Sequence, residues 1–163
     1  MKKFSEVRNS KKVFKQIIEN IDEQENLLNQ ETNTNTSKSE VVNFFSKLFE
    51  SKEMAHVYHL QVKGDQGSYA KHKALGDYYE TMLELLDELI ETYQGQYGLV
   101  EGYDIIDTST TKTKESVDYF EELANWLKHA KNCISDEDTH LHSLIDDIFC
   151  LIYKTIYKLK FLK

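Results

Sequence analysis

Apolar residues recur every three, four or seven positions along most of this chain, with polar residues at the positions between them. This spacing places apolar side chains on one face of a helix and predicts amphipathic helices. We expect helices at about residues 3–29, 37–63, 69–93, 114–134 and from about 135 to 159. No segment shows the alternation typical of a strand, so the predicted fold class is all-α.

The four helices after residue 36 carry continuous apolar stripes, and these stripes should form the core. Two capping boxes support helix starts, S-x-x-E at Ser37 and S-x-x-D at Ser135. On the fourth helix, Trp126 and His129 are expected to pack or to lie at an interface. The predicted core residues are Val41, Phe44, Phe45, Leu48, Phe49, Met54, Leu75, Tyr79, Met82, Leu83, Leu86, Ile90, Val117, Phe120, Leu123, Leu127, Ile134, Leu141, Leu144, Ile145, Ile148, Leu151, Ile152, Ile156 and Leu159.

The connections between the helices predict how they are arranged. The polar segment "NQETNTNTSKS" separates residues 1–36, an N-terminal amphipathic helix with its linker, from residues 37–163. The segment "GDQGS" is a short turn, whereas "GQYGLVEGYDIIDTSTTKT" is a long connection with room for a short helix. Two helical hairpins joined by a long crossover predict a ferritin-like four-helix bundle, here with an extra N-terminal helix.

The composition agrees with long helices and limits the possible partners. The 163 residues suffice for one domain with a core, and they include no proline and only six glycines. A net charge of −8 argues against a surface that wraps nucleic acid and favours a protein that collects cations. Cys133 and Cys150 lie in apolar helical patterns, so we expect two buried, reduced thiols in a cytoplasmic protein, with a disulfide as the less favoured alternative. No signal peptide or membrane span is predicted.

The beginning of the chain is basic, unlike the rest. It could hold DNA phosphates, or it could be the solvated face of a helix that packs on the bundle. Acidic residues follow within the same predicted helix and offset its charge. The candidate DNA contacts are Lys2, Lys3, Arg8, Lys11, Lys12 and Lys15.

Three of the six histidines gather around the turn between the second and third predicted helices, in "AHVYHLQVKGDQGSYAKH". His59 and His72 flank the turn and can lie close together. On the third helix, Asp87 and Glu91 are four residues apart, so their carboxylates share one face at about 6 Å. His72 precedes Asp87 by about 22 Å along the helix axis, so the two cannot share a metal within one subunit.

A two-fold axis would bring the histidine pair of one subunit to the carboxylate pair of another, and it would form two identical sites. Two-fold contacts are the commonest contacts in oligomers. Imidazole and carboxylate ligands together suit Fe(II) and tolerate Zn(II). The sequence therefore predicts an intersubunit metal site, with His59 and His72 from one subunit and Asp87 and Glu91 from the other.

These segments resemble the signature of the Dps proteins, the miniferritins. The stretch "YHLQVKG" matches an H-x-x-x-[KR]-G segment, and "KHKALGDYYETMLELLDELIET" carries a second histidine followed by a D-x-x-x-E pair. The segment "DEDTHLHSLIDDIFCLIYKTIYKLKFL" is similar to the last helix of that family. The resemblance covers about residues 38–162, and its four ligand positions fall on His59, His72, Asp87 and Glu91.

The resemblance implies a hollow shell of twelve subunits built from dimers. In that family iron binds at the dimer interfaces, is oxidised there preferably by hydrogen peroxide, and is stored inside as ferric mineral. Many members also bind DNA through basic tails. On this basis we expect an iron-binding ferroxidase and storage protein, with His59, His72, Asp87 and Glu91 as catalytic and metal-binding residues.

Two positions depart from the family pattern. Leu60 stands where tryptophan is usual, and Gly76 stands where an acidic residue is common, with Asp77 adjacent. The second change predicts a weaker or displaced second metal position. The alternative function is therefore a shell with an impaired centre, or a helical-bundle accessory protein, that acts by binding DNA or protein.

The remaining histidines have competing explanations. Glu53 and His56 form the E-x-x-H motif of larger ferritins, but no second motif completes a di-iron site within one bundle. His140 and His142 open the last helix beside two aspartates. They could bind a metal, or they could reflect the polarity preferred at a helix start.

Overall fold

The computed structural model describes residues 39–64 and 69–162, and every regular element within them is helical. A first helix covers residues 39–61. It is followed by α2 (Tyr69–Tyr97), the 3-10 helix η1 (Ser109–Lys112), α3 (Ser116–Ala130), the 3-10 helix η2 (Lys131–Cys133) and α4 (Thr139–Phe161). The predicted all-α class is confirmed for these residues. The predicted helix at 3–29, its linker and the six basic residues at positions 2–15 lie outside them.

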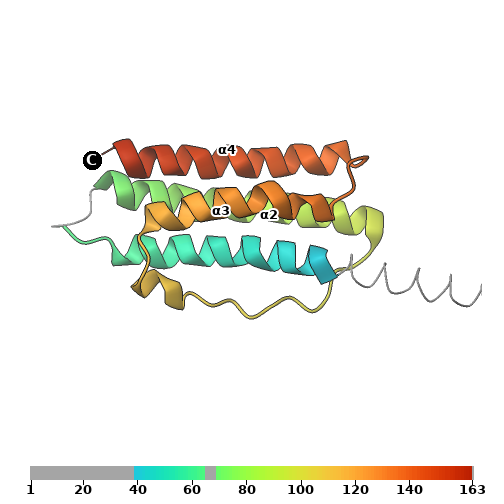
Figure 1. Cartoon of the computed structure of the whole chain (residues 1–163), viewed down its shortest axis with the longest axis horizontal. Coiled ribbons are helices and arrows are strands. Elements are labelled where there is room, and N and C mark those ends of the chain that lie inside the picture. Colours follow the sequence, from blue (N-terminus) through green and yellow to red (C-terminus); the bar gives the residue numbers. More distant parts are fainter. Residues whose placement is uncertain (1–38, 65–68, 163) are drawn as a thin grey trace, which may run out of the picture. The chain divides into compact units, whose positions relative to one another are not determined.

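The long helices run alongside one another within a single unit of the chain, Glu40–Lys163, called here the helical unit (Figure 1). The 39–61 helix and α2 point in opposite directions, as do α3 and α4. Residues 98–115 run back along the 39–61 helix, so α3 starts at the same end as α2 (Figure 1). The helix α4 packs against both α2 and α3. The start of α2 and the start of α4 therefore lie at opposite ends of the helical unit.

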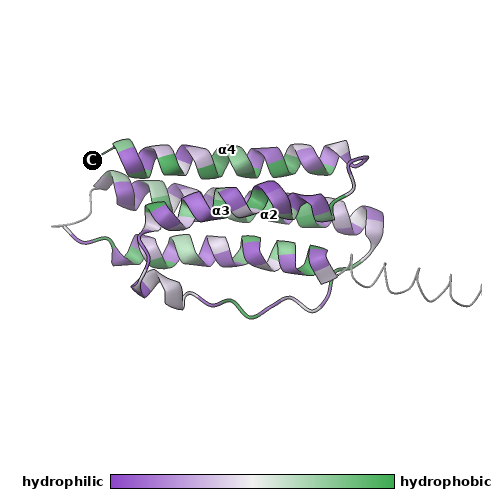
Figure 2. Ribbon diagram, in the orientation of Figure 1, coloured by the Kyte–Doolittle hydropathy of each residue, from purple (hydrophilic) through white to green (hydrophobic). Residues whose placement is uncertain are grey.

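A core of apolar side chains fills the space between the helices, and hydrophobic positions recur along each helix at helical spacing (Figure 2). On α2, the predicted core residues Met82 and Leu86 are buried. The prediction was wrong for Leu83, which is 45% exposed, and it missed Tyr78, which is buried. Tyr78 lies four residues before Met82 and shares its face, whereas Leu83 is rotated from that face by about 100°. The neighbouring Tyr79 packs only on the edge of the core.

The long connection, residues 98–115, is fastened to the 39–61 helix at both ends. Near its beginning, the Asp104 N–H donates a hydrogen bond to Ser46 Oγ over 3.0 Å. Near its end, the Tyr58 hydroxyl donates to the Lys114 carbonyl over 2.8 Å. These bonds join positions more than fifty residues apart in the sequence. The crossover is thus part of the packed structure.

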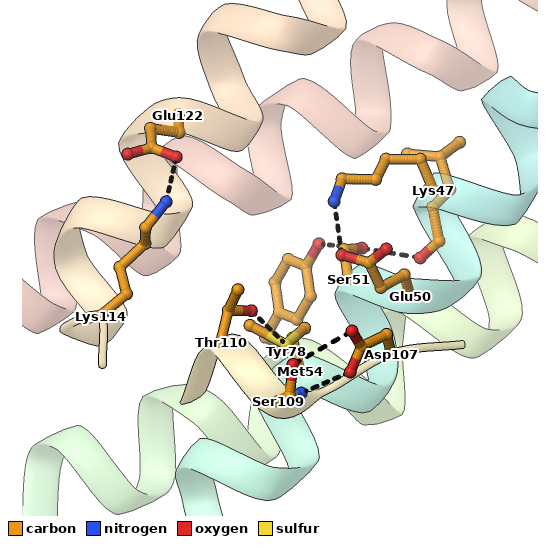
Figure 3. A network of polar contacts seen from close by, with 11 residues as sticks. Lys47, Glu50, Ser51, Met54, Tyr78, Asp107, Ser109, Thr110, Lys114 and Glu122 are labelled. Carbon is orange, nitrogen blue, oxygen red and sulfur yellow. Dashed lines mark hydrogen bonds and ion pairs between the residues drawn. The ribbon is translucent and has the colours of Figure 1, made fainter. Parts of the chain in front are cut away.

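The 3-10 helix η1 confirms that the connection contains a short helix. The Asp107 carboxylate accepts hydrogen bonds from the Ser109 N–H and hydroxyl, at 2.8 and 3.0 Å (Figure 3). The Thr110 hydroxyl donates to Met54 Sδ over 3.6 Å, which joins η1 to the 39–61 helix (Figure 3). The same view shows the buried Ser51 and Tyr78 hydroxyls, which are 2.9 Å apart.

Two helix boundaries differ from the predictions. The helix α2 extends to Tyr97, and Gly98 then adopts a φ of +88°, the left-handed conformation that commonly ends helices. The capping box predicted at Ser135 is wrong, because α4 begins at Thr139. The Ser135 hydroxyl instead accepts a hydrogen bond from the Glu137 N–H over 3.3 Å.

Both cysteines are free thiols, but only one is shielded. Cys133 is half-buried, whereas Cys150 is exposed on α4, so the prediction of two buried thiols was wrong for Cys150. The core-facing positions around it are Ile148 and Ile152, both buried, and this arrangement turns Cys150 outward. In the part of the chain that the structure describes, no helix is long and apolar enough to cross a membrane.

Candidate metal centre

The two histidines that flank the predicted turn lie against each other at one end of the helical unit. His59 belongs to the last turn of the 39–61 helix, and His72 belongs to the first turn of α2. Their rings stack with centroids 3.7 Å apart and an angle of 25° between the planes. The structure thus brings together the pair that the sequence placed on either side of the turn.

Each of these histidines is held by the backbone of the other. His59 Nδ1 lies 2.8 Å from the His72 carbonyl oxygen, and His72 Nδ1 lies 3.2 Å from the His59 carbonyl oxygen. A carbonyl only accepts, so each Nδ1 carries a proton and the lone pair of the neutral ring is on Nε2. Histidines that ligate metals commonly donate their other N–H to a carbonyl in this way. The pair therefore presents two Nε2 atoms with the chemistry of metal ligands.

The stacking determines how the two Nε2 atoms can serve a metal. The lone pair of each nitrogen lies in its ring plane, and the two planes are nearly parallel. Lone pairs in two nearly parallel planes do not converge on one ion. As the rings stand, an ion bound by either histidine takes its remaining ligands from other groups.

Gly76 lies directly beside the His59 ring, one helical turn after His72. A Cβ built at this position would lie 3.3 Å from His59 Cε1 and 3.3 Å from His59 Nδ1, closer than nine in ten real Cβ contacts. The missing side chain therefore makes room for the imidazole in the position that lets Nδ1 reach the His72 carbonyl. From the sequence we interpreted Gly76 only as the loss of an acidic residue. The contact between Gly76 and His59 was missed because this contact depends on how two helices pack.

Asp77 does not take the place of the acidic side chain that is missing at position 76. Its carboxylate lies 2.7 Å from Lys73 Nζ and 2.9 Å from Lys158 Nζ, on the side of α2 that meets α4. The hydrogen bond from Lys73, followed by that from Lys158, holds the pKa of Asp77 below its usual value. Asp77 therefore serves as an ion-pair partner between α2 and α4.

Tyr79 extends the two stacked histidines into a row of four rings. The His56 and Tyr79 rings have centroids 4.6 Å apart, and the His59 ring meets Tyr79 edge-on at 5.5 Å. His56 Nδ1 lies 3.9 Å from Glu53 Oε2, which is too long for a hydrogen bond. His56 therefore stands at the outer end of this row and packs on Tyr79, which the sequence had assigned to the core.

The carboxylate half of the predicted site lies farther along α2. Asp87 and Glu91 are exposed, and the uninterrupted helix places Asp87 about 22 Å from His72 along its axis. Among the described residues, no group of three or more histidine, cysteine, aspartate or glutamate side chains could hold a metal ion. One copy of the chain thus brings His59 and His72 together but keeps them apart from Asp87 and Glu91.

Among the described residues, the interior of the helical unit lacks the carboxylate ligands that a di-iron site with the E-x-x-H motif would need. Beside the 39–61 helix the interior contains Met54 and the hydroxyls of Ser51, Tyr78 and Tyr119. Burial raises the pKa of Tyr78 and Tyr119, so both phenols stay protonated. Among the described residues, the one buried carboxylate is Asp138, at the start of α4.

The second histidine pair, at the start of α4, is engaged in hydrogen bonds to neighbouring segments. His140 Nε2 lies 3.0 Å from Gln96 Oε1, and His142 Nε2 lies 3.1 Å from the Ser135 carbonyl oxygen. Asp138 accepts hydrogen bonds from Gln96 at 2.8 Å and from the Tyr97 hydroxyl at 2.5 Å. These donors, Tyr97 first, lower the pKa of Asp138. This end of the helical unit is therefore a polar joint between α2 and α4.

One comparison with known proteins gives a match. A family of unknown function, DUF5856, matches residues 59–159, which is more than half of the chain and includes His59, His72, Asp87 and Glu91. No curated protein and no solved structure matches the chain.

Proposed function

We propose that this chain binds and oxidises Fe(II) at sites shared between two copies. The chain belongs to the DUF5856 family, whose function is unknown, so the proposal is argued from the residues of the chain itself. The observation that carries the proposal is the His59–His72 pair, in which both Nδ1 atoms are bound to main-chain carbonyls and both Nε2 atoms keep a lone pair. Zinc would compete for the same ligands.

The arrangement of the helices supports a ferritin-like four-helix bundle as the fold. Two antiparallel pairs, the 39–61 helix with α2 and α3 with α4, are joined by a connection that runs back along the helical unit (Figure 1). This is the connectivity of bundles with one long crossover, whose members include iron-binding proteins. The interior differs from the di-iron members of that class, so we place the iron outside it.

Two copies related by a two-fold axis would complete the site. His59 and His72 of one copy would meet Asp87 and Glu91 of the other, and the same axis would form a second site. An exposed leucine accompanies each half. Leu60, next to His59, is 69% exposed, and Leu83, one turn before Asp87, is 45% exposed. Both leucines would become buried in such a contact.

In this proposal Fe(II) is the substrate, and the protein supplies ligands, charge and open positions for the oxidant. Two Fe(II) ions each lose one electron, and one hydrogen peroxide takes up both electrons with two protons to give two waters. The histidines bind as neutral ligands, while Asp87 and Glu91 offset the charge that grows as iron is oxidised. Further copies would close a shell of twelve in which the ferric product is stored.

A mixing experiment tests the shared site directly. A His59→Ala/His72→Ala variant and an Asp87→Asn/Glu91→Gln variant should each oxidise Fe(II) no faster than iron in buffer. A dimer of one copy of each variant would have one intact site and one site without ligands. When the two variants are mixed equally and exchange subunits freely, half of the dimers are of this kind, so about a quarter of all sites should be restored. The measurement is Fe(II) loss after peroxide addition to anaerobically loaded protein. Restored Fe(II) oxidation in the mixture shows a shared site. If both variants are inactive and the mixture stays inactive after subunit exchange is confirmed, the shared site is contradicted.

The same samples distinguish the ferroxidase proposal from the alternative function, a shell or accessory protein that acts without an iron centre. The native mass should correspond to dimers or to a closed shell of about twelve subunits, because a monomer has no shared site. If the variants oxidise iron as fast as the parent chain, the ferroxidase proposal fails. DNA binding through the basic residues at 2–15 would then be tested by mobility shift, which must weaken steeply with salt.

A further inference from the structure

A cavity of about 540 Å³ opens in the helical unit, on residues separate from the candidate metal centre. It lies between the first half of the 39–61 helix, the beginning of the crossover and the end of α3 with η2. Its volume is that of sites for small organic molecules. Its lining residues are Glu40, Asn43, Phe44, Ser46, Lys47, Glu50, Asp104, Ile105, Trp126, His129, Ala130, Asn132 and Cys133.

An aromatic pair forms one wall of this cavity. The Phe44 and Trp126 rings stack with centroids 5.8 Å apart and an angle of 24° between their planes. Phe44 is buried in the core, whereas Trp126 is only half-buried and lines the cavity. The face of such a ring attracts cations, and tryptophan attracts them most strongly.

The charges around the cavity are mainly negative. Of its three carboxylates, Glu50 is paired with Lys47, and both belong to the polar contacts in Figure 3. Among the described residues, no other lysine or arginine lines the cavity, so Glu40 and Asp104 leave this part of its lining negative. Burial, together with the charge of Glu40, raises the pKa of the Cys133 thiol to about 12. Cys133 therefore stays protonated and is not a nucleophile here.

The crossover wall of the cavity is fixed in place by the fold. The Asp104 N–H donates to Ser46 Oγ at 3.0 Å, and the Tyr103 ring packs edge-on against Phe49 at 5.6 Å. These contacts hold the Tyr103 ring and the Asp104 backbone against the 39–61 helix. The aromatic wall and the backbone that carries the Asp104 carboxylate are therefore in position before any ligand arrives.

We propose that this cavity binds an organic cation, an ammonium or guanidinium group carried on an apolar body. The apolar body would pack against the accessible part of Trp126 and the exposed Ile105 side chain, and the cationic group would lie near Glu40 and Asp104. A neutral molecule of the same shape loses the charge attraction, and an anion is repelled. This inference does not depend on iron binding.

Trp126 is the only tryptophan of the chain, so its fluorescence reports directly on this cavity. The full chain is titrated with 2-phenylethylammonium and, in parallel, with its neutral counterpart 2-phenylethanol. A capped Phe-Arg dipeptide forms a third titration. Saturable binding of the amine indicates a free small molecule as the natural ligand, whereas binding of the dipeptide alone indicates a basic side chain of a partner protein.

We expect titration with the cation to give a saturable fluorescence change. The cation should bind at least about fivefold more tightly than the alcohol. Asp104→Asn and Glu40→Gln should each weaken cation binding about two- to fivefold. Glu88→Gln, which removes an exposed charge of α2 outside the cavity, should leave it unchanged. Equal affinity for the amine and the alcohol, or no saturation with either cation, overturns the proposal.

Discussion

Two histidine pairs occupy opposite ends of the helical unit, and they differ in which ring nitrogen is engaged. At the start of α2, His59 and His72 use Nδ1 to bind each other's main-chain carbonyls. At the start of α4, His140 and His142 use Nε2, toward Gln96 Oε1 and the Ser135 carbonyl. The first pair keeps the more accessible nitrogen of each ring for a ligand, whereas the second pair uses it to join segments of the fold.

The carboxylates near the two pairs differ in the same way. Asp138, beside the second pair, is buried and accepts hydrogen bonds from Gln96 and Tyr97. Asp87 and Glu91, proposed to serve the first pair from another copy, are exposed. Residue types alone therefore do not separate a metal site from a structural joint. The separation depends on which ring nitrogen keeps its lone pair and on whether the carboxylate oxygens already accept hydrogen bonds.

Removing each pair should give opposite results. Because the Nε2 ligands are lost, His59→Ala/His72→Ala should lower the rate of peroxide-dependent Fe(II) oxidation roughly 100-fold, to that of iron in buffer. His140→Ala/His142→Ala should keep the rate of the parent chain but lower its melting temperature, since it loses bonds at the joint. Stopped-flow absorbance and thermal unfolding check the two outcomes. Equal loss of activity in both variants would show that the distinction between the pairs is wrong.

The contact between Gly76 and His59 should influence metal affinity without weakening the helix. A Gly76→Ala side chain would lie 3.3 Å from the His59 ring and should displace it, so Fe(II) or Zn(II) should bind about tenfold more weakly. Alanine favours a helix over glycine by about 1 kcal/mol, so lost stability is not the expected cause. Calorimetric titration with Zn(II) measures the affinity.

Gly95→Ala provides the matched control for this substitution. Gly95 lies on the same helix, α2, and nothing lies within 4 Å of a Cβ built there. This variant should gain up to about 1 kcal/mol in the free energy of unfolding and should bind Zn(II) with unchanged affinity. If both glycine variants bind Zn(II) like the parent chain, Gly76 has no positioning role.

The sequence predicted the helices well because their apolar periodicity is strong. The helices at 37–63, 69–93 and 135–159 correspond to the 39–61 helix, α2 and α4, although α4 starts only at Thr139. Periodicity was weaker at deciding between neighbouring residues. Tyr78 and Tyr79 are the same residue type, and the core takes Tyr78 because that position shares a face with Met82.

The site could be predicted only where its residues are close in sequence. His59 and His72 flank a short turn predicted from the sequence, so their approach followed from the two predicted helices. The bonds of Gln96 to Asp138 and His140 join positions more than forty residues apart, and no local pattern reveals them. For the same reason, the sequence could not decide between a metal site and a structural joint at the start of α4.

The stability of the joint at the start of α4 should depend on pH. Its hydrogen bonds lower the pKa of Asp138 in the folded chain, so the ionised carboxylate stabilises the fold. This contribution is fully present above the unfolded value of about 3.9, and it is lost as pH falls through the lower folded value. The melting temperature of Asp138→Asn should therefore be below that of the parent chain at pH 7, and the difference should shrink below about pH 4.

The exposed Asp136 supplies the control for that comparison. Asp136→Asn should melt like the parent chain at pH 7, because no hydrogen bond described at the joint involves the Asp136 side chain. The difference in melting temperature between Asp138→Asn and the parent chain could instead stay constant from pH 7 to about pH 3. That result would show that the Asp138 charge does not stabilise the joint.

The smallest effect is expected at His56, the outer end of the ring row. His56→Ala removes the contact with Tyr79 at 4.6 Å, which at an exposed position contributes about 0.5 kcal/mol to the free energy of unfolding. Zn(II) affinity should change by less than about twofold, because the Tyr79 contact with His59 is kept. The variant is measured with the Gly76→Ala protein in one series of titrations. If His56→Ala loses as much Zn(II) affinity as Gly76→Ala, His56 is a third ligand and the site extends along the 39–61 helix.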